Sequence, residues 1–361
     1  MARPSDLFRD PLLTVLASLL ALFFLFLAAV PGVLFNKTYE EHYDEISEWL
    51  HKRAGLLPGW RAWAGRLAGF WGGGLGLVVF TILGAIVYGF LMPTFGLDLA
   101  SLVALLGLLA GLVIVMFAFD LPARQYHRAR TGDPGHLRVF PGTIVVAIVC
   151  VLLSRAANFQ PGYLYGLIVS YQFRGEMSEA DEGRSAATRS IWALGVSLVA
   201  WLALAVVSPP PAAAAGNSPA GGSVSLPLLA IETMLSTVVV AGVEGALFEL
   251  FPLRFLPGEV VFGWDRRVWA VLFGLSAFAF VAILINPASG YLSSTRTTPL
   301  AIAVALFVVF AIVSVGFWGY FRYRPQPPPR PPMARKVAPE PTVPRKKAAT
   351  RRRKGGGEGG I

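Results

Sequence analysis

The chain has 361 residues, of which 55% are hydrophobic and only 14% are charged, and its mean hydropathy is +0.60. A water-soluble domain of this length needs more polar groups than this to cover its surface, so the composition excludes that class and predicts an integral membrane protein. The formal net charge of +10 belongs to the C-terminal tail, because 12 Lys and Arg from Arg322 onward face only Glu340 and Glu358. The residues before Arg322 hold 19 basic and 19 acidic side chains.

A helix needs about 20 predominantly apolar residues to cross a hydrocarbon layer of about 30 Å. Eight segments of the chain meet this requirement: 11–35, 69–92, 99–119, 139–157, 188–208, 227–250, 267–285 and 299–321. The first is expected to be a retained helix, because no small-residue cleavage site precedes the polar stretch that begins at Asn36. The sequence therefore predicts an all-α, polytopic transmembrane bundle over 11–323, after a short segment 1–10 and before a disordered tail 324–361.

A ninth apolar stretch, 163–173, is too short to cross a membrane as a helix that rises 1.5 Å per residue. If 139–173 is a hairpin that enters and leaves on one side, 15 Lys and Arg of the loops lie inside, against Arg3, Arg9 and Arg296 outside. If 163–173 instead lies outside the membrane, ten fall outside and eight inside before the tail. Because basic loops stay in the cytoplasm, we expect the hairpin, an outer N-terminus and a cytoplasmic C-terminus at the plasma membrane.

The turn of this hairpin is the best candidate for an intramembrane site. Pro161 and Gly162 break the helix there, and broken helix at membrane depth persists only where it lines a cavity or is buried in protein. Charged side chains inside spans are costly unless paired, so Arg155 is expected to pair with Glu244. The alternative is that Arg155 reaches the outer interface. The candidate residues are Arg155, Asn158, Gln160, Pro161, Gly162, Tyr163, Tyr165 and Glu244.

No catalytic residue, metal site or cofactor is predicted. The four histidines lie in polar connecting segments without the spacing of a zinc site, and Cys150, the one cysteine, has no partner for an intrachain disulfide. Glycines at 72–74, 76, 242 and 245 are expected to let helices approach closely. Asp265 is expected to cap the helix that follows it, and Glu232 and Glu249 to reach lipid headgroups.

Several stretches together resemble the actinobacterial membrane proteins that are named for an FGLLP motif. They are Leu34-Phe35-Asn36, Tyr39-Glu40-Glu41-His42-Tyr43-Asp44-Glu45, Phe159-Gln160-Pro161-Gly162-Tyr163-Leu164-Tyr165-Gly166 and the proline-arginine turn at 251–258. The namesake motif itself departs here, since the chain reads Phe248-Glu249-Leu250-Phe251-Pro252. The resemblance covers about residues 10–290 and implies a membrane protein of an uncharacterised family.

A fainter similarity is to site-2 proteases, on Phe255-Leu256-Pro257-Gly258. Pro257 stands where that family has a metal-binding aspartate, and the HExxH helix is absent from the sequence. Kinship with these proteases would therefore imply a member that has lost its zinc and its chemistry.

The basic tail is expected to bind the membrane surface or a protein partner. A proline-rich stretch at 325–332 favours an extended spacer, which would carry the basic cluster away from the last span. The cluster comprises Arg345, Lys346, Lys347, Arg351, Arg352, Arg353 and Lys354. Anionic lipid or an acidic protein surface is the expected partner, and nucleic acid is the weaker alternative because no aromatic residue for base stacking follows Tyr323.

Three functions are left open. The first is a non-catalytic scaffold or accessory protein with the tail as its docking arm. The second is a transporter or channel-like protein whose path is lined by the broken hairpin, although no internal repeat typical of transporters is visible. The third, a degenerate protein of the site-2 protease type, is disfavoured by the missing metal ligands.

Overall fold

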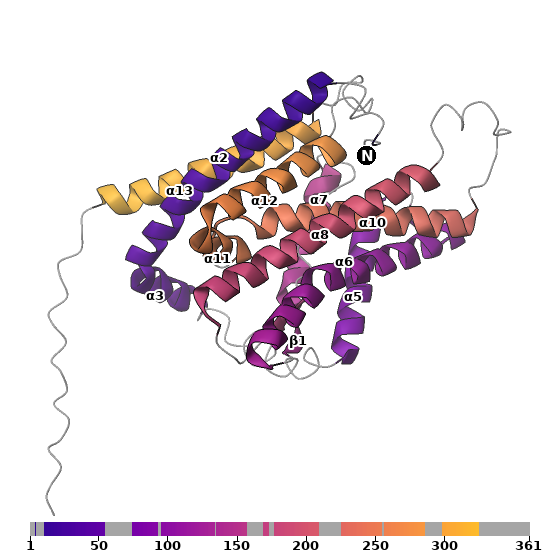
Figure 1. Cartoon of the computed structure of the whole chain (residues 1–361), viewed down its shortest axis with the longest axis horizontal. Helices are drawn as coiled ribbons and strands as arrows, with labels where there is room; N and C mark the ends of the chain where they lie inside the picture. Colours follow the sequence, from indigo (N-terminus) through magenta and orange to yellow (C-terminus); the bar gives the residue numbers. More distant parts are fainter. Residues whose placement is uncertain are drawn as a thin grey trace, which may run out of the picture. The chain divides into compact units, whose positions relative to one another are not determined.

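The computed structural model describes Pro4 and residues 11–54, 74–92, 95–133, 135–156, 169–172, 177–208, 225–254, 256–285 and 298–324. Contacts divide the chain into a unit from Met1 to Arg322 and a unit from Tyr323 to Ile361. The first unit is a bundle of helices (Figure 1). Its elements are α2 (Pro11–Glu41), α3 (Tyr43–Ala54), α5 (Gly74–Gly89), α6 (Leu99–Thr131), β1 (His136–Val139), a 3₁₀ turn (Pro141–Thr143), α7 (Ile144–Ala156), β2 (Val169–Gln172), α8 (Glu179–Val207), α10 (Leu226–Glu249), α11 (Pro257–Trp264), α12 (Arg266–Ala279), a π-helical turn (Phe280–Ile285) and α13 (Thr298–Tyr323).

Six helices of the described residues are long and apolar enough to cross a membrane, where the sequence predicted eight. They are Thr14–Glu41, Leu99–Thr131, Glu179–Val207, Leu226–Glu249, Arg266–Ile285 and Leu300–Tyr323. Their length and composition confirm an all-α, multi-pass membrane protein.

The two remaining predicted spans are shorter helices. The span at 139–157 loses its first residues to β1 and to the turn at Pro141, so α7 has 13 residues and a length of about 20 Å, less than the hydrocarbon thickness of about 30 Å. The span at 69–92 corresponds to α5, which has 16 residues; residues 69–73 lie outside the described part.

The chain around α7 leaves one end of the bundle and returns to it. Strand β1 pairs antiparallel with β2, with His136 opposite Gln172 and Val139 opposite Val169. Paired strands lie about 4.8 Å apart, so the chain that departs after Val139 is back beside it at Val169. A return to the same end is what the hairpin predicted at 139–173 requires, but residues 169–172, expected within its second helix, form a strand. The turn at 157–168 lies outside the described residues.

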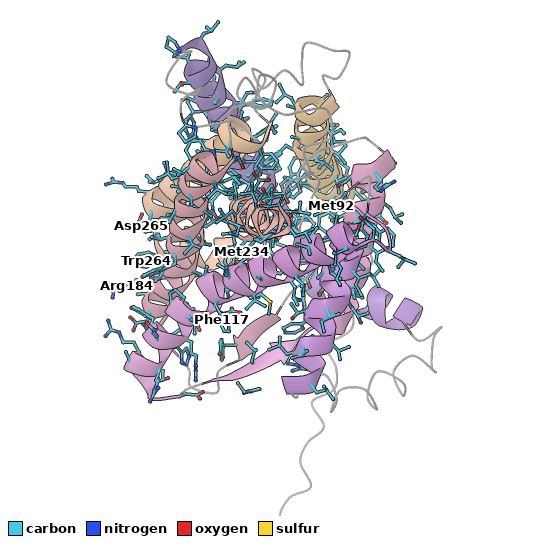
Figure 2. The ribbon with its side chains drawn as sticks, turned by 90° about the vertical axis from the view of Figure 1, so that its right-hand side faces the viewer. Met92, Phe117, Arg184, Met234, Trp264 and Asp265 are labelled. Carbon is cyan, nitrogen blue, oxygen red and sulfur yellow. The ribbon has the colours of Figure 1, made fainter. Side chains whose placement is uncertain are left out.

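Helix α10 runs through the middle of the bundle, and Figure 2 shows it end-on near Met234. Glycines let α6 and α8 approach it closely. A Cβ at Gly111 of α6 would lie 2.6 Å from Cβ of Thr237, and one at Gly245 of α10 would lie 2.9 Å from Cζ of Phe119. A Cβ at Gly242 would overlap Ser197 of α8. Close packing at Gly242 and Gly245 is therefore confirmed, whereas a Cβ at Gly74 would meet nothing within 4 Å.

Charged and aromatic contacts gather the ends of the long helices into one polar end. Arg189, in the first half of α8, contacts Asp120 in the second half of α6 and Glu249 at the end of α10. At the end of α13, Phe317 and Phe321 stack on Phe35 of α2 and on His42, which follows α2. Helix α12 begins at the same end, because Arg184 of α8 lies over the ring of Trp264 just before it.

It follows that α2 and α13 both run toward the polar end. The start of α2 and the end of α13 therefore lie at opposite ends of the bundle, as the sequence predicted for the first and last spans. The direction of α5 follows from the contact of Arg155. This residue lies at the end of α7 that is far from the polar end, and it bonds to Phe90, just after the end of α5. Helix α5 thus runs away from the polar end and α6 runs back.

This arrangement predicts which positions an impermeant reagent reaches from outside the cell. In a Cys150→Ser background, Ser218→Cys, which falls in the sequence between the end of α8 and the start of α10, should be labelled by a membrane-impermeant maleimide in intact cells, because both of these helix ends lie at the far end of the bundle. Ala129→Cys lies in the last turn of α6 at the polar end and should react only after lysis. Labelling of both positions in intact cells would contradict this arrangement.

Candidate functional site

Most of the predicted hairpin site falls outside the part of the chain that the structure describes. This applies to Asn158, Gln160, Pro161, Gly162, Tyr163 and Tyr165, and equally to the tail cluster Arg345, Lys346, Lys347, Arg351, Arg352, Arg353 and Lys354. Arg155 and Glu244 are described, and the predicted pair between them can be examined directly.

The predicted pair of Arg155 with Glu244 is wrong. Arg155 is exposed at the end of α7, and its Nη1 donates a hydrogen bond of 2.8 Å to the carbonyl of Phe90. That carbonyl follows the last turn of α5, where backbone acceptors have no partner within the helix, so a basic side chain satisfies it. The alternative, in which Arg155 extends to the end of the bundle, fits this position better.

Glu244 lies deep in the bundle instead. Its side chain is fully buried, with 0% exposed, on the stretch of α10 that packs against α6 and α8. It is close enough to Cys150 on α7 for an electrostatic interaction. Arg155 follows Cys150 in α7 by more than one helical turn. The guanidinium of Arg155 is therefore separated from the carboxyl group of Glu244.

An ion triad that the sequence did not reveal joins α6, α8 and α10. Nη2 of Arg189 lies 3.5 Å from Oδ1 of Asp120 and 3.2 Å from Oε1 of Glu249. The side chain of Asp120 is 5% exposed, that of Arg189 17% and that of Glu249 21%. Glu249 was expected to reach headgroups, so this placement corrects that prediction; Glu232, at the other end of α10, accepts a hydrogen bond of 2.8 Å from Ser208.

One signal in the sequence could have found the triad. Asp120 directly follows the predicted span 99–119, Arg189 is at the start of the predicted span 188–208, and Glu249 is at the end of the predicted span 227–250. Successive antiparallel spans bring these three positions to the same end, where opposite charges in partly apolar surroundings stabilise each other.

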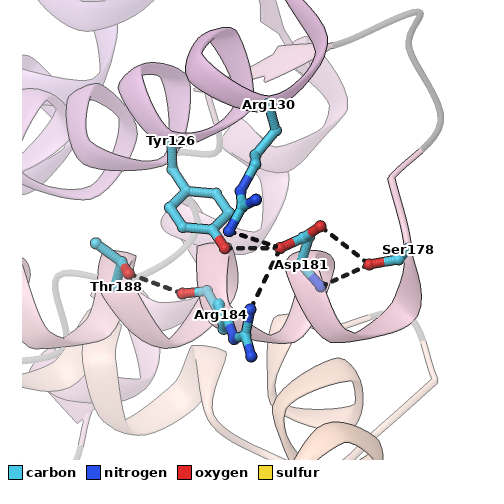
Figure 3. Close-up of polar contacts among 6 residues, drawn as sticks. All are labelled: Tyr126, Arg130, Ser178, Asp181, Arg184 and Thr188. Carbon is cyan, nitrogen blue, oxygen red and sulfur yellow. Dashed lines mark hydrogen bonds and ion pairs between the residues drawn. The ribbon is translucent and has the colours of Figure 1, made fainter.

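A second network joins α6 to the start of α8, as Figure 3 shows. Oδ1 of Asp181 accepts a hydrogen bond of 2.9 Å from the hydroxyl of Tyr126, and it lies 3.5 Å from Arg130 and 3.6 Å from Arg184. The other carboxylate oxygen accepts from Ser178, whose hydroxyl in turn caps α8 by accepting from the backbone N–H of Asp181. Asp181 therefore fixes the start of α8 against α6.

A third set of contacts holds the end of α2 on the turn that follows α10. Asn36 donates from Nδ2 to the carbonyl of Pro252 at 2.9 Å and accepts from the backbone N–H of Arg254 at 3.1 Å. Arg254 also pairs with Glu40, at 2.7 Å between Nη1 and Oε1. A Cβ at Gly32 would lie 2.7 Å from Cγ of Pro252, so this turn packs directly on α2.

Glu259 of α11 lies beside this contact. Burial raises the pKa of Glu259, while Arg254 lowers it and Glu40 raises it further. Desolvation thus prevails over the attraction of Arg254, so the folded chain holds the proton of Glu259 more tightly than the unfolded chain does.

The three contact sets are suited to holding helices, since each links two or three elements at the polar end. Among the described residues, no group of three or more His, Cys, Asp or Glu could hold a metal ion. Comparisons with protein-family models, curated proteins and solved structures found no match to this chain.

The triad predicts a large difference between two arginine variants. Arg189→Leu leaves one buried and one partly buried carboxylate without their cation and should lower the free energy of unfolding by about 3 kcal/mol. Arg130→Leu removes a solvent-exposed ion pair and should lower it much less, because surface ion pairs contribute little to stability. Thermal unfolding of the two purified variants in one detergent measures this difference, and equal losses would argue against a stabilising triad.

The raised pKa of Glu259 predicts a pH-dependent effect. The folded chain holds this proton more tightly than the unfolded chain, so the contribution to stability is full below the ordinary pKa of Glu and is lost as the pH rises through the raised value. Glu259→Gln should therefore gain stability over the unaltered protein at pH 8 compared with pH 4. Unfolding temperatures across this range test it, with the exposed Glu182→Gln as control; a pH-independent difference would contradict the prediction.

Proposed function

We propose that this multi-pass membrane protein is a non-catalytic scaffold or accessory component, whose basic tail docks on anionic lipid or on an acidic protein partner at the cytoplasmic face of the plasma membrane. The observation that carries the proposal is the distribution of charge. Among the described side chains of the bundle, Arg155 is at the far end, and the other basic ones gather at the polar end: Lys37, Arg124, Arg128, Arg130, Arg138, Arg184, Arg189, Arg254, Arg266, Arg267 and Arg322. Because cytoplasmic loops retain Lys and Arg, this distribution favours the polar end as the cytoplasmic one.

The last span ends at that same polar end, and the tail follows it in the chain. Seven basic residues close together, each attracted to an anionic leaflet by about 1 kcal/mol, are enough for surface association at low salt. The attraction weakens as the screening length falls to about 3 Å at 1 M salt. A basic segment that follows a helical bundle in the sequence fits a docking role.

Membership of the FGLLP-motif family is part of the same proposal. The segments that carry the resemblance include Asn36 and Glu40 on one side and the turn from Phe251 onward on the other. These two segments contact each other through the hydrogen bonds of Asn36 and Arg254. Two segments that are far apart in the chain but in contact are expected to occur together in proteins that share one fold, which supports the proposal.

The docking role is tested by neutralising the tail in the full-length protein. Replacing the seven Lys and Arg of the cluster with Gln should abolish salt-sensitive binding to vesicles that contain anionic lipid, and should release the partners recovered with the unaltered protein. A control that replaces the seven with the opposite basic residue, Lys for Arg and Arg for Lys, should bind as the original does. Equal binding to neutral vesicles would exclude the electrostatic account.

A transporter or channel-like function is the second candidate. It is favoured by the return of the chain from β1 to β2, because a segment that enters and leaves at one end is a common way to line a path within a bundle. The fully buried Glu244 near α7 would then lie beside that path. If the neutralised tail left every cellular effect of the chain intact, this second function would be favoured over docking.

A further inference from the structure

The corner where α8, α11 and α12 meet carries three arginines and two aromatic rings. The guanidinium carbon of Arg184 lies 5.8 Å from the ring centre of Trp264, and that of Arg266 lies 5.2 Å from the ring centre of Phe262. Trp264 packs on Gly183 of α8 so closely that a Cβ there would overlap it. Figure 2 shows Arg184, Trp264 and Asp265 along one side of the bundle.

Positive charge exceeds negative charge at this corner. Asp265 caps α12, as the sequence predicted, because its Oδ1 accepts from the backbone N–H of Arg267 at 2.7 Å and of Val268 at 3.3 Å. Within the part of the chain that the structure describes, no acidic side chain forms an ion pair with the exposed guanidinium of Arg266 or Arg267. Arg184 shares Asp181 with Arg130.

An exposed apolar stripe continues from the arginines along α12. Arg267, Val271 and Leu275 follow one another at intervals of four residues, which places them on one face of the helix. The side chains of Val271 and Leu275 are 60% and 55% exposed. A neighbouring stripe on α8 includes Trp192 and Val199, which are 56% and 67% exposed.

We propose that this corner binds one anionic phospholipid of the adjacent leaflet. Its phosphate lies between the guanidinium groups of Arg266 and Arg267, whose N–H donors favour an anion. One acyl chain lies along Val271 and Leu275. Trp264 lies at the level of the headgroups, the depth that tryptophan favours in membranes.

The exposed apolar stripe of Val271 and Leu275 favours a lipid over a soluble phosphate compound as the ligand. A free phosphate ester would gain the charge contacts alone, whereas a lipid also covers the apolar side chains beside them. The site lies in the helical unit and does not depend on the tail, so the two proposals can fail separately.

The experiment titrates the full-length protein, with its tail cluster replaced by Gln, with dioctanoyl phosphatidylglycerol in detergent and follows bound lipid by native mass spectrometry. Arg266→Gln with Arg267→Gln should raise the Kd by about fivefold for each arginine, the factor expected for one basic residue facing an anionic lipid. Lys37→Gln with Arg128→Gln removes the same charge from exposed positions at the same end and should leave the Kd unchanged. Dioctanoyl phosphatidylcholine should bind more weakly and should be insensitive to the Arg266 and Arg267 changes.

Three results would overturn the proposal. One is an unchanged Kd in the Arg266 and Arg267 variant, and another is an equal rise in the control variant, which would indicate diffuse surface charge. The third is displacement of the lipid by glycerol phosphate at the same concentration as phosphatidylglycerol, which would indicate a site for soluble phosphate. Val271→Ser with Leu275→Ser should weaken phosphatidylglycerol binding while leaving the charges in place, and an unchanged Kd there would count against the acyl-chain contact.

Discussion

The ion triad of Asp120, Arg189 and Glu249 is the interaction on which the arrangement of the central helices depends. In a bilayer the hydrophobic effect does not distinguish a neighbouring helix from lipid, so close packing and paired polar groups must select partners. The glycines of α6 and α10 allow their backbones to approach, but glycine contacts alone permit sliding along the helix axis. Arg189 removes that freedom, because a single guanidinium must meet carboxylates from two other helices at one depth.

The remaining contacts at the polar end extend the same principle outward. Asp181 ties the start of α8 to α6 through Tyr126 and Arg130, and Asn36 ties α2 to the turn after α10. Trp269 donates from its indole nitrogen to the carbonyl of Leu250 at 2.7 Å, which joins α12 to that turn as well. Among the described side chains, the opposite end has fewer charges: there Arg155 bonds to a backbone carbonyl and Glu232 accepts a hydrogen bond from Ser208. Directional polar contacts thus concentrate at one end, while apolar and glycine packing holds the rest of the bundle.

The fold class followed from the sequence because composition and the length of apolar runs are set by the bilayer itself. The number of spans did not follow, since hydropathy does not register that β1 and the turn at Pro141 take the first residues of one apolar run. The return of the chain from β1 to β2 could be predicted from the distribution of Lys and Arg, which is a property of the whole chain. The partner of Arg155 could not be predicted in this way. The choice between a buried carboxylate and a helix-end carbonyl depends on the relative depth of α5, α7 and α10 in the bundle. Glu244 and Arg155 are both costly groups in apolar runs, and pairing them by cost alone ignored that difference in depth.

The concentration of charge at one end also constrains where this protein can act. Asp120, Arg189 and Glu249 are three ionisable groups with little exposure, and such groups are better tolerated near the headgroup region than at the centre of the bilayer. The triad therefore needs to stay near one membrane surface, which fixes the depth of α6, α8 and α10 together. The exposed arginines around it then lie at the level of phosphate groups, where their long side chains can extend toward water while aromatic rings cover their stems. A rigid, positively charged surface of this kind is suited to binding from the headgroup plane, and the basic tail that follows α13 extends the same charge preference beyond the bundle.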